Sequence, residues 1–399
     1  MKVAGIVAEY NPFHTGHKFH IDKTREVADG IICLMSGAFT QRGTPGIINK
    51  WARAKCAIES GADLVLELPF PFSCAPAEIF AGGSVDLLNK LAVADYISFG
   101  SEKGEIKPLK TCAKILLENG REISENIRKN AGQGNSYAME IAKQANLLGD
   151  EETLSSPNNL LGIKYIMALE KSGSSIKPYT IKRDNNYNNP VAEGEFASAM
   201  AVREMIKNED TEKIKKYLPV SSFDILKAEM IKEKIYDISN LDSLFCGILR
   251  RENIEKYAYV AEGIENRFAS MAEKYSTIQE IIGAVKTKRY TYTRLSRIAA
   301  SVLVGLDKAT LKENIKGGVA YVKILGANDK GMAILKEIKK KGNIPLVSKG
   351  ADYVRLNAYG KKQFELEMKA QNIASLSCNN VKYRISNLDL INSPYIKRT

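Results

Sequence analysis

The first hundred residues repeat one pattern, and this pattern limits the fold more than any other feature of the chain. The dipeptide Ala-Asp occurs at Ala28–Asp29, Ala62–Asp63 and Ala94–Asp95, at intervals of 34 and 32 residues, and each copy leads into an apolar run (GIICLMSG, LVLELP or YISFGSE). Another apolar run, VAGIVAEY, opens the chain, and helix-like segments separate the runs. This alternation is typical of βαβ units, in which helices cover both faces of a parallel sheet. A solenoid would continue the repeat, whereas the rhythm fades after residue 102.

Two later segments extend this α/β region. SSPNNLLGIKYIMALEKSG predicts a helix that Ser155 or Ser156 caps and that has Pro157 in its first turn. IKPYTIKRD predicts a further strand that ends at Arg183. In a parallel sheet, ligands bind at the carboxyl ends of the strands, so we expect a site where these strands end.

Two further regions of the chain have different residue patterns. Apolar residues at helical spacing predict a mainly helical region over 196–310. AYVKILG, a helix and NIPLVSKG predict a small α/β unit over 311–399. We therefore predict an α/β protein of three domains: a Rossmann-like parallel-sheet domain at 1–195, the helical region, and the C-terminal α/β unit.

The net charge of +12 is carried by the second half of the chain. Residues 1–200 hold 22 Lys and Arg against 23 Asp and Glu, whereas residues 201–399 hold 36 against 23. Such asymmetry favours a polyanion partner such as nucleic acid for the second half, with a merely solvated Lys-rich surface as the alternative. The chain has no apolar run of about 18 residues, so we expect no membrane contact. Six scattered cysteines without a Cys-x-x-Cys pair indicate a reducing cytoplasm and no structural zinc.

All three histidines of the chain, His14, His17 and His20, lie within seven residues just after the first predicted strand. In EYNPFHTGH the pattern His-Thr-Gly-His opens a predicted helix. Imidazoles and a helix N-terminus both donate hydrogen bonds to phosphate oxygens, and Gly16 would let a flat base approach the backbone. Phosphate-transfer chemistry needs mainly such positioning and charge stabilisation. We predict a nucleotide site with His14 and His17 as catalytic residues; solvated histidines or a zinc site are the alternatives.

A basic stretch, KTKRYTYTRLSR, occupies residues 286–297 and contains no acidic residue. We predict that it binds RNA, because cations neutralise phosphates and tyrosines stack on bases. The alternative is a solvated basic helix. The side chains expected to contact RNA are Lys286, Lys288, Arg289, Tyr290, Arg294 and Arg297.

Seven motifs in order along the chain resemble the bacterial tRNA(Met) cytidine acetate ligase family, part of the HxGH nucleotidyltransferase superfamily. They are GIVAEYNPFHTGHKFHI, MSGAFTQRGTPGIINKWARAKCAIESGADLVLELP, IFAGGSVDLLN, FGSE, SPNNLLGIKYI, FASAMAVRE and KTKRYTYTRLSRI. FASAMAVRE matches the superfamily motif ISSTxIR at Ser198 and Arg203, with Met200 in place of Thr. The resemblance implies that acetate attacks the α-phosphate of ATP to give acetyl-adenylate and pyrophosphate. The acetyl group then passes to the exocyclic amine of the wobble cytidine of elongator tRNA(Met).

The resemblance also implies site residues by position. Arg183 would be a third catalytic residue that stabilises phosphate charge, and Arg42 would position the tRNA or the substrate. The implied ATP site consists of Ile6, Val7, Ala8, Glu9, Tyr10, Asn11, Pro12, Phe13, His14, Thr15, Gly16, His17, Lys18, Phe19, Gly100, Asn158, Asn159 and Arg183. Domain 1–195 would then bind ATP and carry out catalysis, and the region 196–310 would bind tRNA.

The expected partners are tRNA, ATP and acetate, with Mg²⁺ accompanying ATP, no prosthetic group and no dedicated protein metal site. The sequence leaves the oligomeric state and the acetate pocket open. Two other functions stay open as well: a small-molecule adenylyltransferase of cofactor synthesis and a non-catalytic RNA-binding protein. The basic second half argues against the first, and the intact His-x-Gly-His pair argues against the second.

Overall fold

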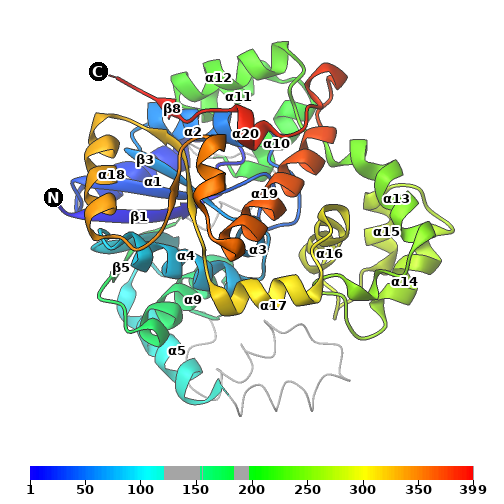
Figure 1. Cartoon of the computed structure of the whole chain (residues 1–399), viewed down its shortest axis with the longest axis horizontal. Coiled ribbons are helices and arrows are strands. Elements are labelled where there is room, and N and C mark those ends of the chain that lie inside the picture. The colour runs from blue at the N-terminus through cyan, green and yellow to red at the C-terminus, as the bar shows by residue number, and fades with distance from the viewer. Residues whose placement is uncertain (121–152, 155, 184–196, 399) are drawn as a thin grey trace.

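One mixed sheet forms the centre of the protein. The computed structural model describes residues 1–120, 153–154, 156–183 and 197–398. In this part of the chain, eight strands form a sheet of order β5-β4-β1-β2-β3-β6-β7, with β8 paired to β6 (Figure 1). The strands are β1 (Val3–Ala8), β2 (Gly30–Ser36), β3 (Leu64–Leu68), β4 (Tyr96–Ser101), β5 (Lys177–Lys182), β6 (Val322–Ala327), β7 (Leu346–Val347) and β8 (Tyr395–Ile396).

The first five strands run parallel to one another, which confirms the predicted Rossmann-like arrangement. The chain builds outward from β1 in one direction through β2 and β3, and in the other direction through β4 and β5. The strand order therefore reverses between β1 and β4. In open α/β sheets this reversal opens a crevice at the carboxyl ends of the strands, where ligands bind.

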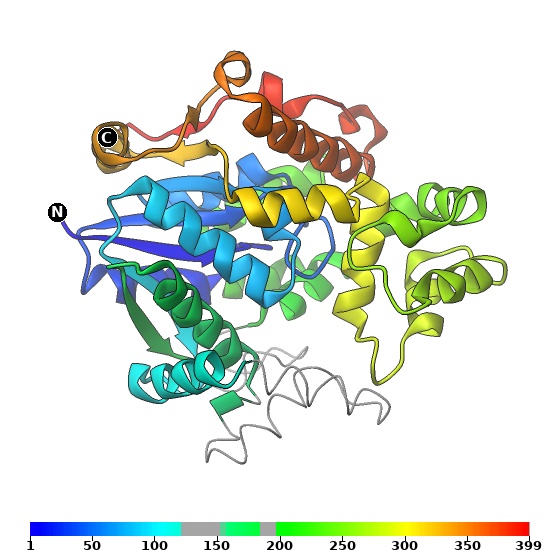
Figure 2. The ribbon, with the colours of Figure 1, turned by 60° about the horizontal axis from the view of Figure 1, so that its bottom comes forward.

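Helices cover both faces of this sheet, as Figure 2 shows. One face carries α1 (Thr15–Arg25) and α2 (Lys50–Glu59), whose apolar side chains form a core with β1, β2 and β3. The other face carries α4 (Ala77–Leu91), α5 (Ile106–Glu118), α9 (Pro157–Ser172) and α18 (Asp329–Lys341) over a larger core. The short helix α3 (Phe70–Ser73) follows β3. Ser156 is the N-cap residue of α9, while the alternative cap, Ser155, lies outside the described residues.

The aspartates of the repeated Ala-Asp dipeptide have a common task at the amino ends of the strands. The carboxylate of Asp29 accepts a hydrogen bond from Lys2 N at 2.8 Å, and that of Asp95 accepts one from Val3 N at 2.7 Å. Asp63 does the same for Ile31 N at 2.8 Å. Each aspartate thus satisfies a backbone donor at the start of a neighbouring strand.

The middle of the chain is helical, as predicted. Its elements are α10 (Ala199–Lys207), α11 (Thr211–Tyr217), α12 (Val220–Ile231), α13 (Asp242–Arg251), α14 (Ile264–Ala272), α15 (Ile278–Val285), α16 (Tyr292–Val304) and α17 (Lys308–Gly317). Helices α13–α16 enclose a core of their own and extend to one side of the sheet (Figure 1). No helix among the described residues is long and apolar enough to cross a membrane.

The C-terminal part differs from the expected separate unit. Strand β6 pairs with β3 in antiparallel register, so β6, β7 and β8 widen the sheet of the first five strands instead of forming another. Helices α19 (Ala358–Leu376) and α20 (Leu388–Ile391) complete this part. The division into three domains stays a prediction, but the third part is built onto the first.

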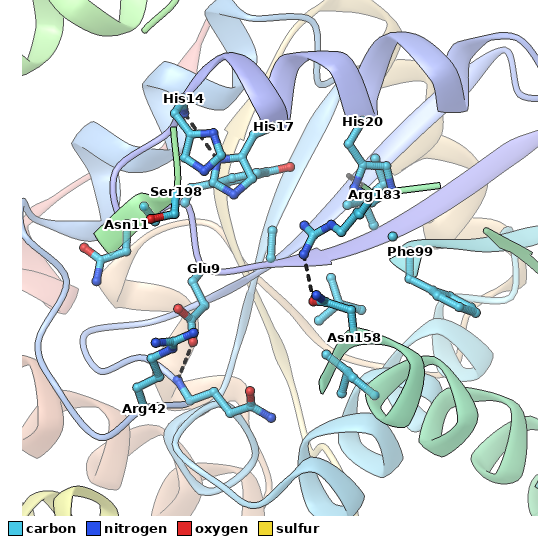
Figure 3. Close-up of a pocket in the computed structure, with 18 of the residues that line it drawn as sticks. Glu9, Asn11, His14, His17, His20, Arg42, Phe99, Asn158, Arg183 and Ser198 are labelled. Atoms are coloured by element: carbon cyan, nitrogen blue, oxygen red, sulfur yellow. Dashed lines mark hydrogen bonds between the residues drawn. The ribbon is translucent and has the colours of Figure 1, made fainter. Parts of the chain in front are cut away.

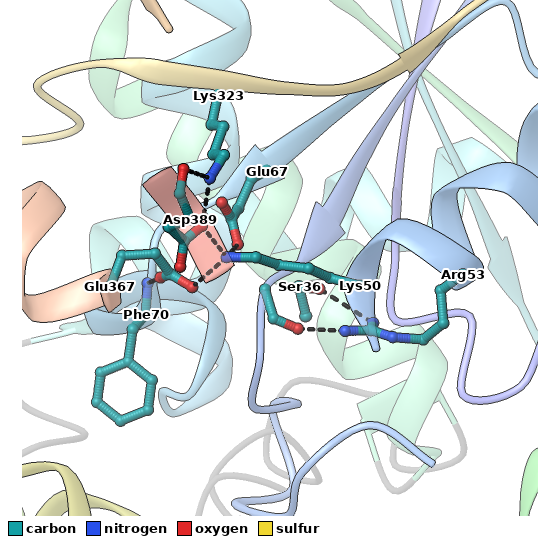
Figure 4. A network of polar contacts seen from close by, with 9 residues as sticks. Ser36, Lys50, Arg53, Glu67, Phe70, Lys323, Glu367 and Asp389 are labelled. Atoms are coloured by element: carbon teal, nitrogen blue, oxygen red, sulfur yellow. Dashed lines mark hydrogen bonds and ion pairs between the residues drawn. The ribbon is translucent and has the colours of Figure 1, made fainter. Parts of the chain in front are cut away.

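A buried ionic network joins the C-terminal part to the nucleotide domain (Figure 4). Lys50 Nζ on α2 lies 2.6 Å from Glu67 Oε1 on β3, 3.3 Å from Glu367 Oε1 on α19 and 2.7 Å from Asp389 Oδ1 on α20. Lys323 on β6 also pairs with Asp389, and all five side chains are buried. Burial opposes the charge on Lys50, but the three carboxylates outweigh it and raise its pKa. Burial, followed by the neighbouring Glu367, raises the pKa of Glu67.

Candidate active site

A cavity of about 220 Å³ lies at the carboxyl ends of β1 and β4, where the strand order reverses (Figure 3). It is bounded by the loop after β1, helix α1, the loop after β2, and the starts of α9 and α10. Twelve residues predicted from the sequence line it: Ile6, Val7, Ala8, Glu9, Tyr10, Asn11, His14, His17, Arg42, Gly100, Asn158 and Arg183. The predicted catalytic residues, Arg42 and most of the other predicted residues at the ends of β1 and β4 are thus brought together in one place.

His14 and His17 form a reciprocal cap at the start of α1. His14 Nδ1 accepts a hydrogen bond from Gly16 N at 3.1 Å, and His17 Nδ1 accepts one from His14 N at 3.2 Å. A neutral imidazole that accepts with Nδ1 carries its proton on Nε2. The cap therefore fixes the same tautomer in both rings, whose centroids lie 3.7 Å apart. The three-residue spacing of His14 and His17 thus determines both where α1 starts and which ring nitrogen carries the proton.

The cap and the local electrostatics both favour the neutral form of the two rings, because each Nδ1 accepts a backbone hydrogen bond and the pKa of each ring is lowered. Burial, followed by the charges of Arg183 and Arg203, lowers the pKa of His14 to about 3. Burial and then the neighbouring His14 lower the pKa of His17 well below its usual 6.5. In this state each ring offers an N–H donor without a positive charge of its own. The charge that attracts an anion comes from the nearby arginines.

Arg183 is held at the cavity by a chain of polar contacts that starts at β4. Glu102 accepts hydrogen bonds from Asn158 Nδ2 at 2.7 Å and from Asn159 N at 2.8 Å, at the start of α9. Asn158 Oδ1 in turn accepts a hydrogen bond from Arg183 Nη1 at 2.7 Å. A Cβ atom on Gly100 would collide with the Arg183 side chain, so the glycine is required for this close approach.

Two further arginines fix the loop that carries the histidine motif. Arg53, buried on α2, donates to Glu9 O at 2.7 Å, Ser36 O at 3.0 Å and Ile48 O at 3.2 Å, and also to Gly37 O. Its fork of donors ties the loop after β1 to the loop after β2. Figure 4 shows the contact with Ser36.

The second arginine, Arg203 on α10, donates to Asn11 O at 2.7 Å and lines the cavity. Ser198 caps α10 by accepting from Ala201 N at 3.0 Å, and it lines the cavity with Met200. The segment FASAMAVRE, which is weak evidence on its own, therefore brings a cation to the site.

Some predicted ATP residues shape the loop but are absent from the described cavity lining. Gly16 serves through its N–H on His14, and Phe13 packs against Tyr10 and His17. Lys18 forms an ion pair with Asp22 on the outer side of α1. The set that does not line the cavity is Pro12, Phe13, Thr15, Gly16, Lys18, Phe19 and Asn159.

The sequence interpretation missed several residues of the cavity. His20 is not among the predicted site residues, yet it lines the cavity beside Arg183. The aromatic and apolar wall also had no signal of its own in the sequence. This wall consists of Phe80, Phe99, Leu161, Gly162 and Tyr165.

The basic stretch at 286–297 runs from the end of α15 into α16. Lys286 and Lys288 are exposed, whereas Tyr290 is only 7% exposed and packs into the helical core. The expectation that Tyr290 stacks on a base is therefore corrected, because its ring is already used in packing. Glu262 lies 2.8 Å from Arg289 and 3.7 Å from Arg294, so the fold brings an acid to a stretch that has none in sequence.

The far end of this stretch reaches the cavity. Arg297 Nη1 donates to Gln41 O at 3.3 Å, and Gly43 packs directly against the backbone of Ser296. Gln41 and Arg42 both line the cavity. The predicted RNA-binding stretch and the predicted nucleotide site thus share one loop, the one after β2.

This fold and this site define a nucleotidyltransferase. The chain belongs to the family described as "HIGH Nucleotidyl Transferase", whose model matches residues 1–389. A protein of Acetivibrio thermocellus named tRNA(Met) cytidine acetate ligase is 39% identical and aligns over 96% of this chain and 97% of its own length. A protein of the same name from Caldanaerobacter subterraneus subsp. tengcongensis is 38% identical over the full length of both. The resemblance stated from the sequence is confirmed.

The structure of Thermotoga maritima TmcAL bound with alpha-thio ATP matches the whole chain with a TM-score of 0.93 at 32% identity. A ligand-free structure of the same protein matches with a TM-score of 0.94. The likeness covers all of both chains. It therefore includes the helical region and the C-terminal part as well as the sheet.

Proposed function

We propose that this protein is an ATP-dependent ligase that acetylates the wobble cytidine of elongator tRNA(Met). The observation that carries the proposal is the pair of capped histidines at the strand-order reversal, in a chain whose full-length relatives are named tRNA(Met) cytidine acetate ligase. The wobble position and the elongator tRNA rest on the resemblance. Action on tRNA also implies work in the cytoplasm.

In the first step, a carboxylate oxygen of acetate attacks the α-phosphorus of ATP. The bond between this phosphorus and the α–β bridging oxygen breaks, and pyrophosphate leaves with the bonding electrons. His14 and His17 donate their Nε2–H groups to phosphate oxygens, and Arg183 and Arg203 supply positive charge. Because these donors are already oriented in the ligand-free protein, little reorganisation accompanies the build-up of charge in the transition state.

In the second step, the exocyclic amine of cytidine attacks the acetyl carbonyl carbon of the mixed anhydride. AMP leaves, and the amine loses one proton. This amine is a poor nucleophile, so placement beside the anhydride supplies much of the rate. An unpaired base in an anticodon loop can be splayed into the cavity at small cost. The loop that holds Arg42 contacts both the cavity and the basic stretch at 286–297, which supports a place for the bound tRNA beside the adenylate.

Magnesium fits this site as a companion of ATP. No group of three or more metal-binding side chains exists among the described residues, and Glu9 is the acidic side chain among those that line the cavity. Such a donor set suits an ion held mainly by phosphates and water, with one carboxylate within reach. The ion would neutralise charge on the phosphates.

A pyrophosphate-release assay with and without acetate and tRNA tests the proposal. Release that needs acetate, together with AMP formation that also needs tRNA, supports it. Release that depends on a mononucleotide and yields a dinucleotide would instead support a small-molecule adenylyltransferase. Binding of tRNA without any ATP turnover would support a non-catalytic RNA-binding protein.

A further inference from the structure

The third histidine of the chain occupies the cavity with the opposite hydrogen-bonding polarity from the other two. His20 Nε2 lies 3.0 Å from Ser98 Oγ on β4, and Ser98 Oγ lies 2.7 Å from Thr24 Oγ1. Thr24 Oγ1 lies 2.8 Å from His20 O. The last acceptor in this series of hydrogen bonds is the His20 carbonyl oxygen, which can only accept. It therefore fixes the direction of the other hydrogen bonds in the series.

Thr24 has one hydroxyl proton, and it goes to His20 O. Ser98 must therefore donate its own proton to Thr24, and the lone pair left on Ser98 accepts from His20 Nε2–H. This assignment leaves Nδ1 of His20 without a proton. In His14 and His17 the caps place the proton on Nε2 and use Nδ1 internally. The cavity thus combines two imidazoles that donate with one imidazole that accepts.

We propose that His20 Nδ1 accepts a hydrogen bond from a ribose hydroxyl of ATP and so selects ribonucleotides. This inference rests on the proposed function, because it takes ATP as the substrate of the cavity. His20 lies three residues beyond His17 on α1, which corresponds to about 4.5 Å along a helix axis. In ATP the group next to the α-phosphate is the ribose, while the amino group of adenine lies at the far end of the nucleoside. A nitrogen one helical turn from the phosphate-binding histidines is therefore placed for the sugar.

The surroundings of His20 support a ligand that is neutral and carries a hydroxyl. Ser98 is buried and Thr24 is buried, so the polar clamp behind the ring is closed to water. Nδ1 has no hydrogen-bond partner among the described residues, and the ring lines the cavity. Because the ring lines the cavity and its Nε2 is already used by Ser98, Nδ1 is the ring nitrogen available to a donor from the ligand.

The test is isothermal titration of the full-length protein with ATP, 2′-deoxy-ATP and 3′-deoxy-ATP. One neutral hydrogen bond corresponds to a loss of roughly five- to tenfold in affinity for one of the two deoxy analogues. His20→Gln keeps a donor for Ser98 but removes the acceptor at Nδ1, so we expect its affinities for ATP and for that analogue to be nearly equal. His20→Asn places an amide oxygen near the position of Nδ1, so we expect it to retain the preference for ATP.

The ratio of the affinity for ATP to the affinity for the deoxy analogue separates this role from a structural one, because a damaged fold weakens the binding of all three nucleotides alike. Lys23→Gln, an exposed change on the same helix, is the matched control and should keep the wild-type ratio. A wild-type protein that binds both deoxy analogues as tightly as ATP would overturn the inference, as would an unchanged ratio in His20→Gln. Purine riboside triphosphate lacks the amino group of adenine. If it binds the wild type more weakly than ATP does, but binds His20→Gln as tightly as ATP does, Nδ1 contacts adenine instead of the ribose. A protein that binds no ATP at all would refute the proposed function itself.

Discussion

The strongest functional prediction concerns His14, whose two ring nitrogens have separate tasks that one pair of substitutions can divide. Nδ1 caps α1 by accepting from Gly16 N, while Nε2 carries the proton proposed for the phosphates. His14→Ala removes both functions. His14→Asn removes the Nε2–H donor but keeps a side-chain oxygen at the position where Asn is among the best capping residues.

The magnitudes follow from these two contacts. Loss of a charge-stabilising donor lowers the rate by about 10² to 10³, and both variants should show this loss. Loss of an N-cap costs about 1 kcal/mol in the free energy of unfolding, and only the Ala variant should show it. The assays are acetate-dependent ATP–pyrophosphate exchange and urea unfolding. An Asn variant that exchanges pyrophosphate at the wild-type rate would refute the assignment of Nε2. Equal destabilisation by Asn and Ala would refute the cap.

Three further predictions concern protonation, stability and RNA binding. The chain has three histidines, and the pKa values of all three rings are lowered in the ligand-free fold, to about 3 for two of them, chiefly by burial. Imidazole NMR signals should thus not titrate between pH 8 and 5.5, and a titration near pH 6.5 would contradict this. The unfolded chain binds protons below pH 6.5, so stability should fall from there toward pH 3, by up to about 1.4 kcal/mol per pH unit and histidine. Lys50→Met should lower the free energy of unfolding by about 3–5 kcal/mol, because it leaves buried carboxylates unpaired; a Lys50→Met protein as stable as the wild type in urea titrations would contradict this. Lys288→Ala should reduce the slope of log affinity for tRNA against log salt concentration by about one unit. Arg289→Ala should change this slope less, because Arg289 pairs with Glu262. A larger effect of Arg289→Ala in filter binding would contradict this.

The local signals in the sequence predicted the first five strands and the histidine site. Apolar runs between helix-like segments indicate where the strands lie. The loop after β1 is short, so its His-Thr-Gly-His motif also indicates where the next helix starts. The same reasoning could not find contacts between distant segments. Lys50 and Glu367 are 317 residues apart, and the paired residues Glu67 of β3 and Lys323 of β6 are also far apart in the sequence, so no local pattern records either contact.

Burial explains the other differences. Tyr290 stands among cations in the sequence and looks available to RNA, but its neighbours in the helical core come from other helices. Arg203 carries a weak motif in which Met replaces Thr, and only the position of α10 at the cavity shows that its guanidinium reaches the loop after β1. His20 follows the recognised motif, and its polarity depends on Ser98, which is 78 residues away.

The central claim is that this cavity makes an acetyl-adenylate that is delivered to one cytidine of a tRNA. The most direct test is incubation of the protein with ATP, magnesium, labelled acetate and unmodified tRNA transcripts, followed by mass spectrometry of the nucleosides. We predict labelled acetylcytidine in elongator tRNA(Met), absent when the wobble cytidine is changed to uridine and reduced by about 10² or more in His14→Asn. Label at another nucleoside, or ATP turnover that leaves every tRNA unlabelled, would contradict it.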